Sequence, residues 1–134
     1  MSNKVAAALL MNEKNEILLQ LRDNKKTIDY PGYWGTLGGH CEENEEPVDA
    51  LKRELKEEIN FDVKESKFIG ILDDGVKHEV HLFKVQIRKK VNEITLNEGR
   101  KIEYFAFPKV LDIKIPARLR EFFLSNKKEI FNHQ

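Results

Sequence analysis

Apolar runs and turn residues in the first part of the chain predict a series of short β-strands. The run Val5 to Met11 predicts a buried strand, and the mostly apolar segment Ile17 to Leu21 predicts a second one. The turn-forming residues Asn12 to Asn15 join them, so the two segments are expected to form a hairpin. Tyr33 to Leu37 predicts a further short strand, and Gly38-Gly39 after it predicts a loop.

A helix is the clearest prediction from the middle of the chain. Between Pro47 and Ile59 the apolar residues recur at helical spacing, at positions 48, 51, 55 and 59. Proline is favoured at the first position of a helix, and Asn60 directly after the last apolar residue is a typical helix end. We therefore expect one helix over residues 47–59.

The second half of the chain predicts another hairpin, a strand and a C-terminal helix. Phe68 to Leu72 and Val80 to Ile87 are strand-like and flank the turn Asp73-Asp74-Gly75. Ile102 to Phe107 predicts one more strand, and Ala117 to Phe131 has the apolar side of an amphipathic helix. The order of strands, helix, strands and helix favours an α+β fold in which helices cover a mixed sheet.

Size and charge limit the functions that this chain can have. Its 134 residues, 40% of them hydrophobic, fit a single domain over residues 1–134. Lys plus Arg and Asp plus Glu both total 23, so no net positive field would hold long nucleic acid or an acidic membrane. No apolar stretch approaches the roughly 20 residues of a membrane span. The lone Cys41 and the absence of a signal-like start predict a cytoplasmic protein.

Three carboxylates share one face of the predicted helix. At helical spacing Glu54, Glu57 and Glu58 lie together, although like charges at these separations repel by a few tenths of a kcal/mol per pair. A divalent cation reverses this repulsion, and hard oxygen ligands suit magnesium. The alternative is an ordinary solvated face whose charge Lys52 and Lys56 partly neutralise.

The acidic helix belongs to a longer spaced pattern. Gly39 is followed by five residues, Glu45, seven residues and then Arg53 to Phe61, RELKEEINF. These 23 positions resemble the Nudix box, a glycine and a glutamate followed by Arg-Glu-apolar-X-Glu-Glu-X-Gly-apolar. Asn60 replaces the second glycine of that pattern, and Asn44 stands where many members have glycine. Asparagine is the residue that best replaces glycine in the left-handed conformation, so we expect both positions to adopt it.

The resemblance implies a fold, a reaction and a metal site. It implies a Nudix α/β/α sandwich that cleaves a phosphoanhydride bond in a nucleoside diphosphate linked to a group X. By resemblance, Glu54, Glu57 and Glu58 hold Mg²⁺, or Mn²⁺ in its place, with help from the Gly39 carbonyl. Glu54 is the first choice for the general base, and Glu98, in a turn before a strand, is the alternative. All four glutamates are therefore candidate catalytic residues.

Three more residues have expected roles near this site. Arg53 and Glu45 are expected to form a bidentate contact that ties the loop to the helix and fixes the metal ligands. Arg22 resembles an arginine that contacts phosphates in MutT-like relatives. The alternative for Arg22 is an ordinary surface arginine.

The resemblance implies a small nucleotide as the substrate, and it leaves three interpretations of the function. The short chain resembles the MutT-like group, whose members convert a nucleoside triphosphate to a monophosphate and pyrophosphate. The first alternative is an ADP-ribose or nucleotide-sugar pyrophosphatase, and the second is a domain that only senses nucleotides. Arg118 follows Pro116-Ala117 where the MutT prototype has an asparagine that reads oxidised guanine, which argues against the same base specificity. The protein is expected to be a monomer or a homodimer.

Histidines and aromatic residues give weaker signals. His78 and His81 are at odd spacing in a strand-like run, which predicts opposite faces and no shared metal. His40 and Cys41 lack the orienting group that a nucleophilic pair needs. The aromatic residues Tyr30, Tyr33, Trp34 and Phe83 are expected either to fill the core or to stack on a base.

Overall fold

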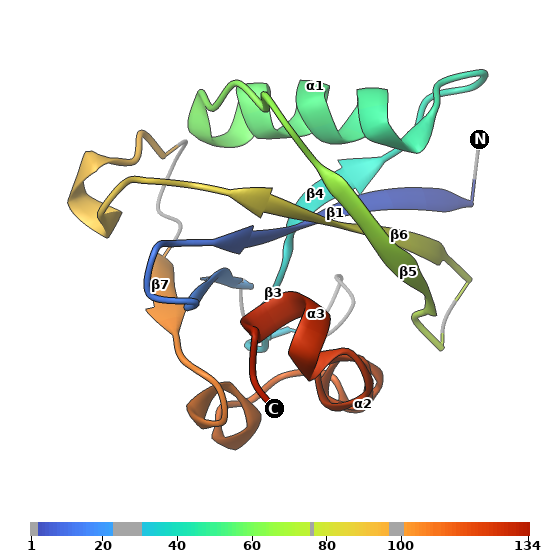
Figure 1. Cartoon of the computed structure of the whole chain (residues 1–134). Coiled ribbons are helices and arrows are strands. Elements are labelled where there is room, and N and C mark those ends of the chain that lie inside the picture. The colour runs from blue at the N-terminus through green and yellow to red at the C-terminus, as the bar shows by residue number, and fades with distance from the viewer. Residues whose placement is uncertain (1–2, 23–30, 76, 97–100) are drawn as a thin grey trace.

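The chain folds around one mixed β-sheet, as a computed structural model shows (Figure 1). The structure describes residues 3–22, 31–75, 77–96 and 101–134. Its strands are β1 Lys4–Met11, β2 Ile17–Leu21, β3 Trp34–Gly35, β4 Leu37–His40, β5 Lys67–Asp73, β6 Glu79–Gln86 and β7 Lys101–Phe105. Their order is β3-β2-β1-β6-β5, with β4 paired to β1 and β7 paired to β2. β1 and β6 are parallel and every other pair is antiparallel, so the predicted mixed sheet is confirmed.

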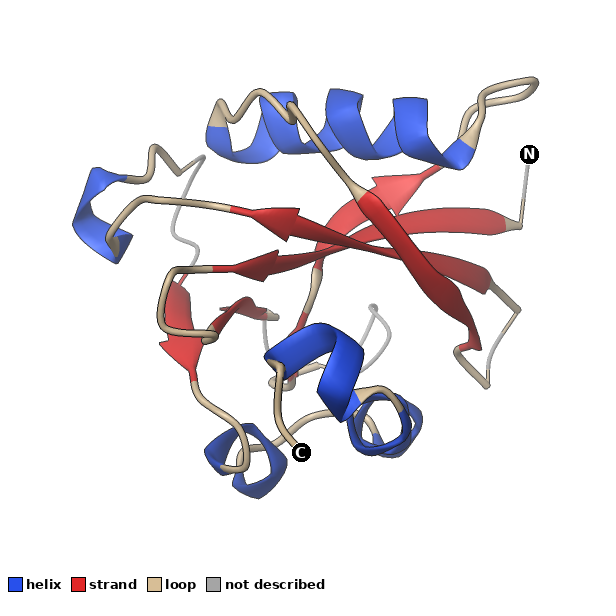
Figure 2. Cartoon of the chain, viewed as in Figure 1, coloured by secondary structure: helices blue, strands red, loops and turns tan. Residues whose placement is uncertain are grey.

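Helices cover both faces of this sheet, as Figure 2 shows. The long helix α1 (Pro47–Ile59) lies on one face, and α2 (Ala117–Ser125) and α3 (Lys127–Phe131) lie on the other. Two short 3-10 helices, η1 (Val91–Glu93) and η2 (Lys109–Asp112), occupy the connections around β7. The arrangement is the α/β/α sandwich that was predicted.

Strand β1 shows why the layers form on these two sides. Successive strand residues point to opposite faces, and both faces of β1 are apolar. Ala6, Ala8 and Leu10 pack in the cluster beneath α1, whereas Leu9 and Met11 pack in the cluster beneath α2 and α3. A strand buried on both sides becomes a continuous apolar run, which is what its sequence shows.

Both predicted hairpins are confirmed, and two predictions were wrong in detail. Gly38-Gly39 does not form a loop, because these residues lie within β4 and pair with Ala7 and Ala6 of β1. Glycine lowers the intrinsic strand preference, but pairing with the buried β1 overrides it. The C-terminal helix is divided at Asn126, whose φ of −121° departs from helical geometry. Its side-chain amide donates to the carbonyl of Phe122 at 3.0 Å, which provides a local alternative to the helical pattern.

None of the helices among the described residues is both long enough and apolar enough to cross a bilayer.

Candidate functional site

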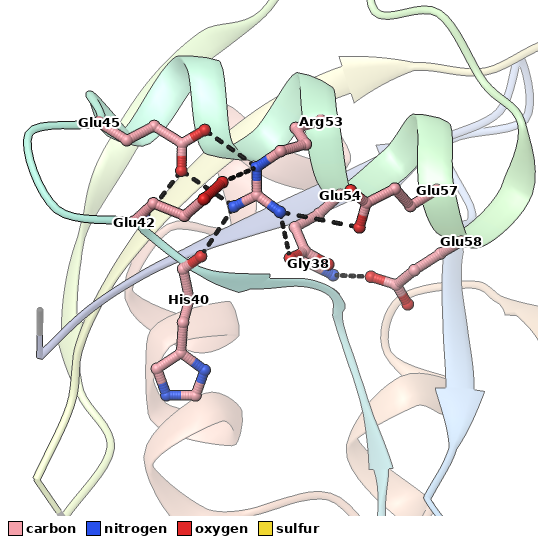
Figure 3. Close-up of polar contacts among 8 residues, drawn as sticks. All are labelled: Gly38, His40, Glu42, Glu45, Arg53, Glu54, Glu57 and Glu58. Carbon is pink, nitrogen blue, oxygen red and sulfur yellow. Dashed lines mark hydrogen bonds and ion pairs between the residues drawn. The ribbon is translucent and has the colours of Figure 1, made fainter. Parts of the chain in front are cut away.

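Helix α1 places the acidic ridge, which we define as Glu54, Glu57 and Glu58, along β4 (Figure 3). Pro47 begins the helix, and the buried residues Leu51 and Leu55 hold it on the sheet. Because these apolar residues face the core, the three carboxylates on the adjacent face lie at the edge of the helix next to the β4 backbone.

Left-handed asparagines shape both ends of the segment that carries the ridge, as predicted. Asn60 has φ 53° and ψ 40°, and its backbone N–H donates to the carbonyls of Leu55 and Lys56 at the end of α1. Asn44 has φ 65° in the loop before the helix. Asparagine therefore fills the conformational role of glycine at both positions.

Two glycines of β4 lie directly against the ridge. The backbone N–H of Gly38 donates to Oε1 of Glu58 at 3.2 Å. A Cβ atom at Gly39 would lie 2.6 Å from each carboxylate oxygen of Glu54, so only glycine leaves room for that side chain. The strand backbone and the carboxylates thus form one compact surface.

Arg53 is the central cation of this surface. Its Nε and Nη2 donate to the two carboxylate oxygens of Glu45 at 3.0 and 2.9 Å, which is the expected bidentate contact. Nη2 also donates to the carbonyl of His40 at 3.0 Å, and Nη1 donates to Glu54 at 2.9 Å. One guanidinium therefore links the loop, β4 and the ridge, a geometry that lysine could not reproduce.

Further carboxylates surround the same guanidinium. Glu42 lies 3.1 Å from Nε, and Glu57 lies 3.7 Å from Nη1. Hydrogen bonds from Arg53, followed by a backbone contact with Glu42, lower the pKa of Glu45 to about 2. The same pair, led by the hydrogen bond to Glu45, raises the pKa of Arg53 above its ordinary value. Both groups stay charged at neutral pH.

The donor set of the ridge fits a hard divalent cation. Its carboxylates and the nearby backbone carbonyls are oxygen ligands, and the Glu57 side chain is 60% exposed against 19% for Glu54. Within the described ranges, no group of three or more His, Cys, Asp or Glu side chains converges closely enough to enclose a metal. Magnesium does not require such a cage, because it keeps several waters and is usually held by one or two carboxylates and substrate phosphates.

A cavity of about 300 Å³, here called the pocket, lies on the other side of β4. Gly38, Gly39 and His40 form one wall of it. Its floor is aliphatic, with Val5, Ala7, Leu37, Leu72, Val80, Leu82 and Leu119. Most of these side chains belong to the cluster under α2 and α3, so β4 separates the pocket from the ridge on the face of α1. Gly38 and Gly39 therefore border both the pocket and the ridge.

Polar side chains line the rest of the pocket. Arg22 at the end of β2 is among them, and its backbone N–H donates to the carbonyl of Tyr33 at 2.8 Å. Arg118, near the start of α2, lines the pocket and packs on the turn at Gly75. Its Nη1 donates to the carbonyl of Asp73 at 3.4 Å. Two arginines thus line the pocket, whereas the carboxylate of Asp74 in the same lining is in contact with His78 at 2.9 Å. The two guanidinium groups suit an anionic ligand.

Sequence reasoning did not identify the histidines of this pocket. His78 precedes β6 instead of lying within it, and its ring meets that of His40. His81 is in β6, where it contacts Glu79 and lies near Phe68. The premise that His78 and His81 point to opposite faces of one strand is therefore wrong, because only His81 lies in β6. Only the turn at residues 73–75 could have suggested that His78 folds back toward β4.

Other residues that the sequence suggested lie away from the pocket or outside the part of the chain that the structure describes. Trp34 packs edge-on against Phe105, and Phe83 is only 8% exposed, so both rings contribute to the core. Among described residues, the pocket lining contains no phenylalanine, tyrosine or tryptophan. The second base candidate, Glu98, lies outside the described residues, as does Tyr30.

Comparisons with known proteins agree with the sequence pattern and the fold. A model of the NUDIX domain matches residues 1–125. An 8-oxo-dGTP diphosphatase from Proteus vulgaris is 30% identical over 96 residues, which cover 71% of this chain and 84% of that protein. Diphosphoinositol polyphosphate phosphohydrolase 2 from Rattus norvegicus is 30% identical over 105 residues, or 76% of this chain and 57% of that protein.

A solved structure supports the fold independently. The crystal structure of a MutT protein from Methanosarcina mazei Go1 matches with a TM-score of 0.77 at 23% identity. The match covers 98% of this chain and 95% of that one, so it includes both helical layers and the sheet.

Proposed function

This chain belongs to the NUDIX family, and on that premise we propose that it is a MutT-like nucleoside triphosphate diphosphatase that releases a nucleoside monophosphate and pyrophosphate. As a member of that family it is a pyrophosphohydrolase acting on phosphorus-containing anhydrides. The finer proposal rests on one observation. The acidic ridge and the pocket with its arginine rim lie on the two sides of the Gly38-Gly39 backbone, so a nucleotide in the pocket has its phosphates beside the ridge.

We propose Glu54, Glu57 and Glu58, with the Gly39 carbonyl, as the residues that hold Mg²⁺ or, in its place, Mn²⁺. The chemistry of these oxygen donors supports the assignment. When bound, the metal supplies charge neutralisation for the diphosphate oxygens and lowers the pKa of a coordinated water. The exposed position of Glu57 gives it the most open approach to a ligand.

The remaining groups of the site are proposed to position the metal ligands and to accept a proton. Arg53 and Glu45 are proposed as positioning residues, because their bidentate contact fixes the loop against α1 while Nη1 of Arg53 holds the Glu54 carboxylate. Glu54 is our first choice for the base that accepts a proton from the attacking water, since its carboxylate is mostly shielded and held in place. Glu98 remains the alternative base.

Arg22 is proposed to contact the phosphate chain. It lines the pocket together with Gly38 and Gly39, the two glycines that lie against the ridge. A planar guanidinium matches two phosphate oxygens at once.

We further propose that residues 1–134 act as a single domain, since the ridge, the pocket and both helical layers are built on one sheet.

A substrate panel tests this proposal. Nucleoside triphosphates, among them 8-oxo-dGTP, are compared with ADP-ribose, a nucleotide sugar and a diphosphoinositol polyphosphate, each with Mg²⁺ or Mn²⁺. We expect pyrophosphate and a nucleoside monophosphate from the triphosphates. Turnover confined to ADP-ribose, the nucleotide sugar or the inositol compound would contradict the proposal. Binding of nucleotides without turnover of any compound would favour the sensor interpretation.

The panel needs a control for contaminating phosphatases. The Glu57→Gln variant, purified in the same way, keeps the shape of the ridge and removes one charge. Activity that persists unchanged in this variant does not come from the ridge. If that activity separates from the protein on a second column it belongs to a contaminant, and if it stays with the protein the assignment of the ridge is wrong.

A further inference from the structure

Two histidines from distant parts of the chain meet at the wall of the pocket. His40 is the last residue of β4, and His78 directly precedes β6. Their Nε2 atoms lie 3.1 Å apart, and both residues line the pocket. Neither ring has a role in the proposed hydrolysis.

A carboxylate fixes the orientation of one of these rings. Oδ2 of Asp74 lies 2.9 Å from Nδ1 of His78, and Oδ1 of Asp74 accepts the backbone N–H groups of Lys77 and His78 at 3.2 and 3.1 Å. The neutral ring that donates from Nδ1 to Asp74 carries its lone pair on Nε2, which is directed at His40. Histidines that bind metals commonly donate their other ring N–H to a carboxylate in this way.

The backbone of the second histidine is held equally well. His40 pairs with Val5 of β1, and its carbonyl accepts the Nη2–H of Arg53 at 3.0 Å. The ring itself extends from the strand on the side away from Arg53, as Figure 3 shows. Both imidazoles are therefore attached to positions that the fold determines.

We propose that Nε2 of His40 and Nε2 of His78 together bind a borderline transition-metal cation such as Zn²⁺, Ni²⁺ or Cu²⁺. With Zn–N bonds of about 2.0–2.1 Å and tetrahedral angles, two nitrogens on one zinc lie about 3.3 Å apart. The observed 3.1 Å is close to this separation. The ring planes are 79° apart and the centroids are 4.8 Å apart, so the rings are inclined toward each other instead of lying end to end.

Binding requires only a tautomer change at one ring. In the metal-free protein one Nε2–H lies between the two rings as a hydrogen bond. When His40 carries its proton on Nδ1 instead, both Nε2 lone pairs are available and the net charge of the pair does not change. Asp74 keeps its contact with Nδ1 of His78 in both forms.

This site differs in kind from the acidic ridge and goes beyond the proposed hydrolysis. Imidazole nitrogen favours Zn²⁺, Ni²⁺ and Cu²⁺, whereas carboxylate and carbonyl oxygens favour Mg²⁺ and Mn²⁺. Two protein ligands leave the other coordination positions open to water or to a ligand in the pocket. Arg22 and Arg118 line the same pocket, so we expect an anion, a phosphate or a carboxylate, to complete the coordination.

Electron paramagnetic resonance of Cu²⁺ tests the site directly. The full chain is titrated with Cu²⁺ in the presence of excess Mg²⁺, which occupies oxygen sites and is silent in this measurement. We expect one Cu²⁺ with hyperfine coupling to two imidazole nitrogens, and we expect Zn²⁺ to displace it only in large excess, because Cu²⁺ binds such sites more tightly than Zn²⁺. Retention of an all-oxygen Cu²⁺ spectrum would overturn the proposal.

Matched variants assign the two nitrogens. His40→Gln and His78→Gln should each remove one nitrogen coupling and weaken Cu²⁺ binding at least about tenfold, whereas His81→Gln should change neither. Asp74→Asn keeps Oδ1 for the turn and removes the acceptor for Nδ1 of His78, so it should weaken binding by roughly 10-fold or more. If His78→Gln fails to fold, His40→Gln decides alone, because His40 is exposed. Wild-type coupling in His40→Gln would overturn the proposal.

Discussion

The acidic ridge and the pocket lie on the two sides of the same glycine strand, but they are assembled differently. The ridge and the groups that hold it come from residues 38–58, which are the end of β4, a loop and one helix that follow one another in the chain. The pocket collects side chains from β1, β4 and β6 and from the start of α2, which are far apart in sequence. Local sequence thus specifies the ridge, and the tertiary fold specifies the pocket.

The two regions also differ in how their charges are balanced. On the ridge side, one guanidinium touches several carboxylates, so the charge is compensated and the geometry is held by hydrogen bonds. In the pocket, Arg22 and Arg118 lie beside an aliphatic floor, and the carboxylate of Asp74 contacts the ring of His78 at 2.9 Å. We expect changes on the ridge to lower turnover and changes in the pocket to alter substrate binding.

The largest expected effect tests the ridge. Glu57→Gln keeps the size of the side chain and removes its charge, and we expect kcat to fall by roughly 100-fold or more because metal-assisted charge stabilisation is lost. Glu121→Gln is the matched control, since Glu121 is an exposed carboxylate on α2. Initial rates of pyrophosphate release measure both variants. Turnover of Glu57→Gln within about threefold of the wild type would contradict the assignment of the ridge.

The second prediction uses the glycine strand that separates the two regions. A Cβ atom at Gly39 overlaps the carboxylate of Glu54, so Gly39→Ala should displace that side chain and lower kcat by roughly 10- to 100-fold. A Cβ atom at Gly38 instead overlaps the carbonyl of Ala6, and Gly38 has φ 146°. Gly38→Ala should therefore lower the free energy of unfolding by roughly 1–3 kcal/mol.

Urea unfolding and steady-state kinetics on the same two preparations separate these effects. We expect Gly39→Ala to unfold near the wild-type midpoint with low activity, and Gly38→Ala to unfold at a clearly lower midpoint. The reverse pattern would show that Glu54 does not depend on the open space at Gly39.

This contrast explains how much the sequence could predict. The helix over 47–59 depends on residues close in the chain, so spacing and residue type were sufficient to predict it. The left-handed asparagines and the contact between Arg53 and Glu45 are also local, and the resemblance to the Nudix box predicted them. The strand at Gly38-Gly39 was missed, because pairing with β1 and not local preference determines it.

The pocket could not be predicted from the sequence, because its residues are far apart in the chain and only the tertiary fold brings them together. His40 and His78 are 38 residues apart and meet only because β4 and β6 both pair with β1. Arg118 reaches the pocket because α2 packs against β5, and Gly75 in the turn after β5 leaves room for its guanidinium. Contacts between residues so far apart in the chain cannot be predicted from a periodic pattern in the sequence.

A third, smaller effect tests the pocket. Arg118→Gln removes a positive charge from the rim and should raise KM by about 3- to 10-fold while kcat changes little, because a partly solvated contact to an anion contributes about 1 kcal/mol. Arg88→Gln is the control, because Arg88 is an exposed residue outside the pocket lining. Steady-state kinetics with the best substrate of the panel measure both constants. A lowered kcat with unchanged KM would place Arg118 with the ridge and weaken the comparison.

The smallest expected effect is on the pH dependence of Tm, and it tests the contact between Glu45 and Arg53 that supports the ridge. The contact with Arg53 lowers the pKa of Glu45 from 4.5 to about 2, so the ionised carboxylate stabilises the folded state. That contribution is complete above pH 4.5 and is lost as the pH falls through about 2. The difference in Tm between wild type and Glu45→Gln should therefore be constant from neutral pH to about 4.5 and shrink below it.

A double-mutant cycle identifies the partner in this pH dependence. In an Arg53→Met background the Glu45 carboxylate has lost its bidentate donor, so Glu45→Gln should produce a difference in Tm that no longer shrinks in the same pH range. Added salt should reduce the wild-type difference, because the pair is partly exposed and its charges are screened. Calorimetry of the four proteins across pH measures both effects. A wild-type difference that persists undiminished to pH 2 would mean that Arg53 supports the ridge through geometry alone, without the charge of Glu45.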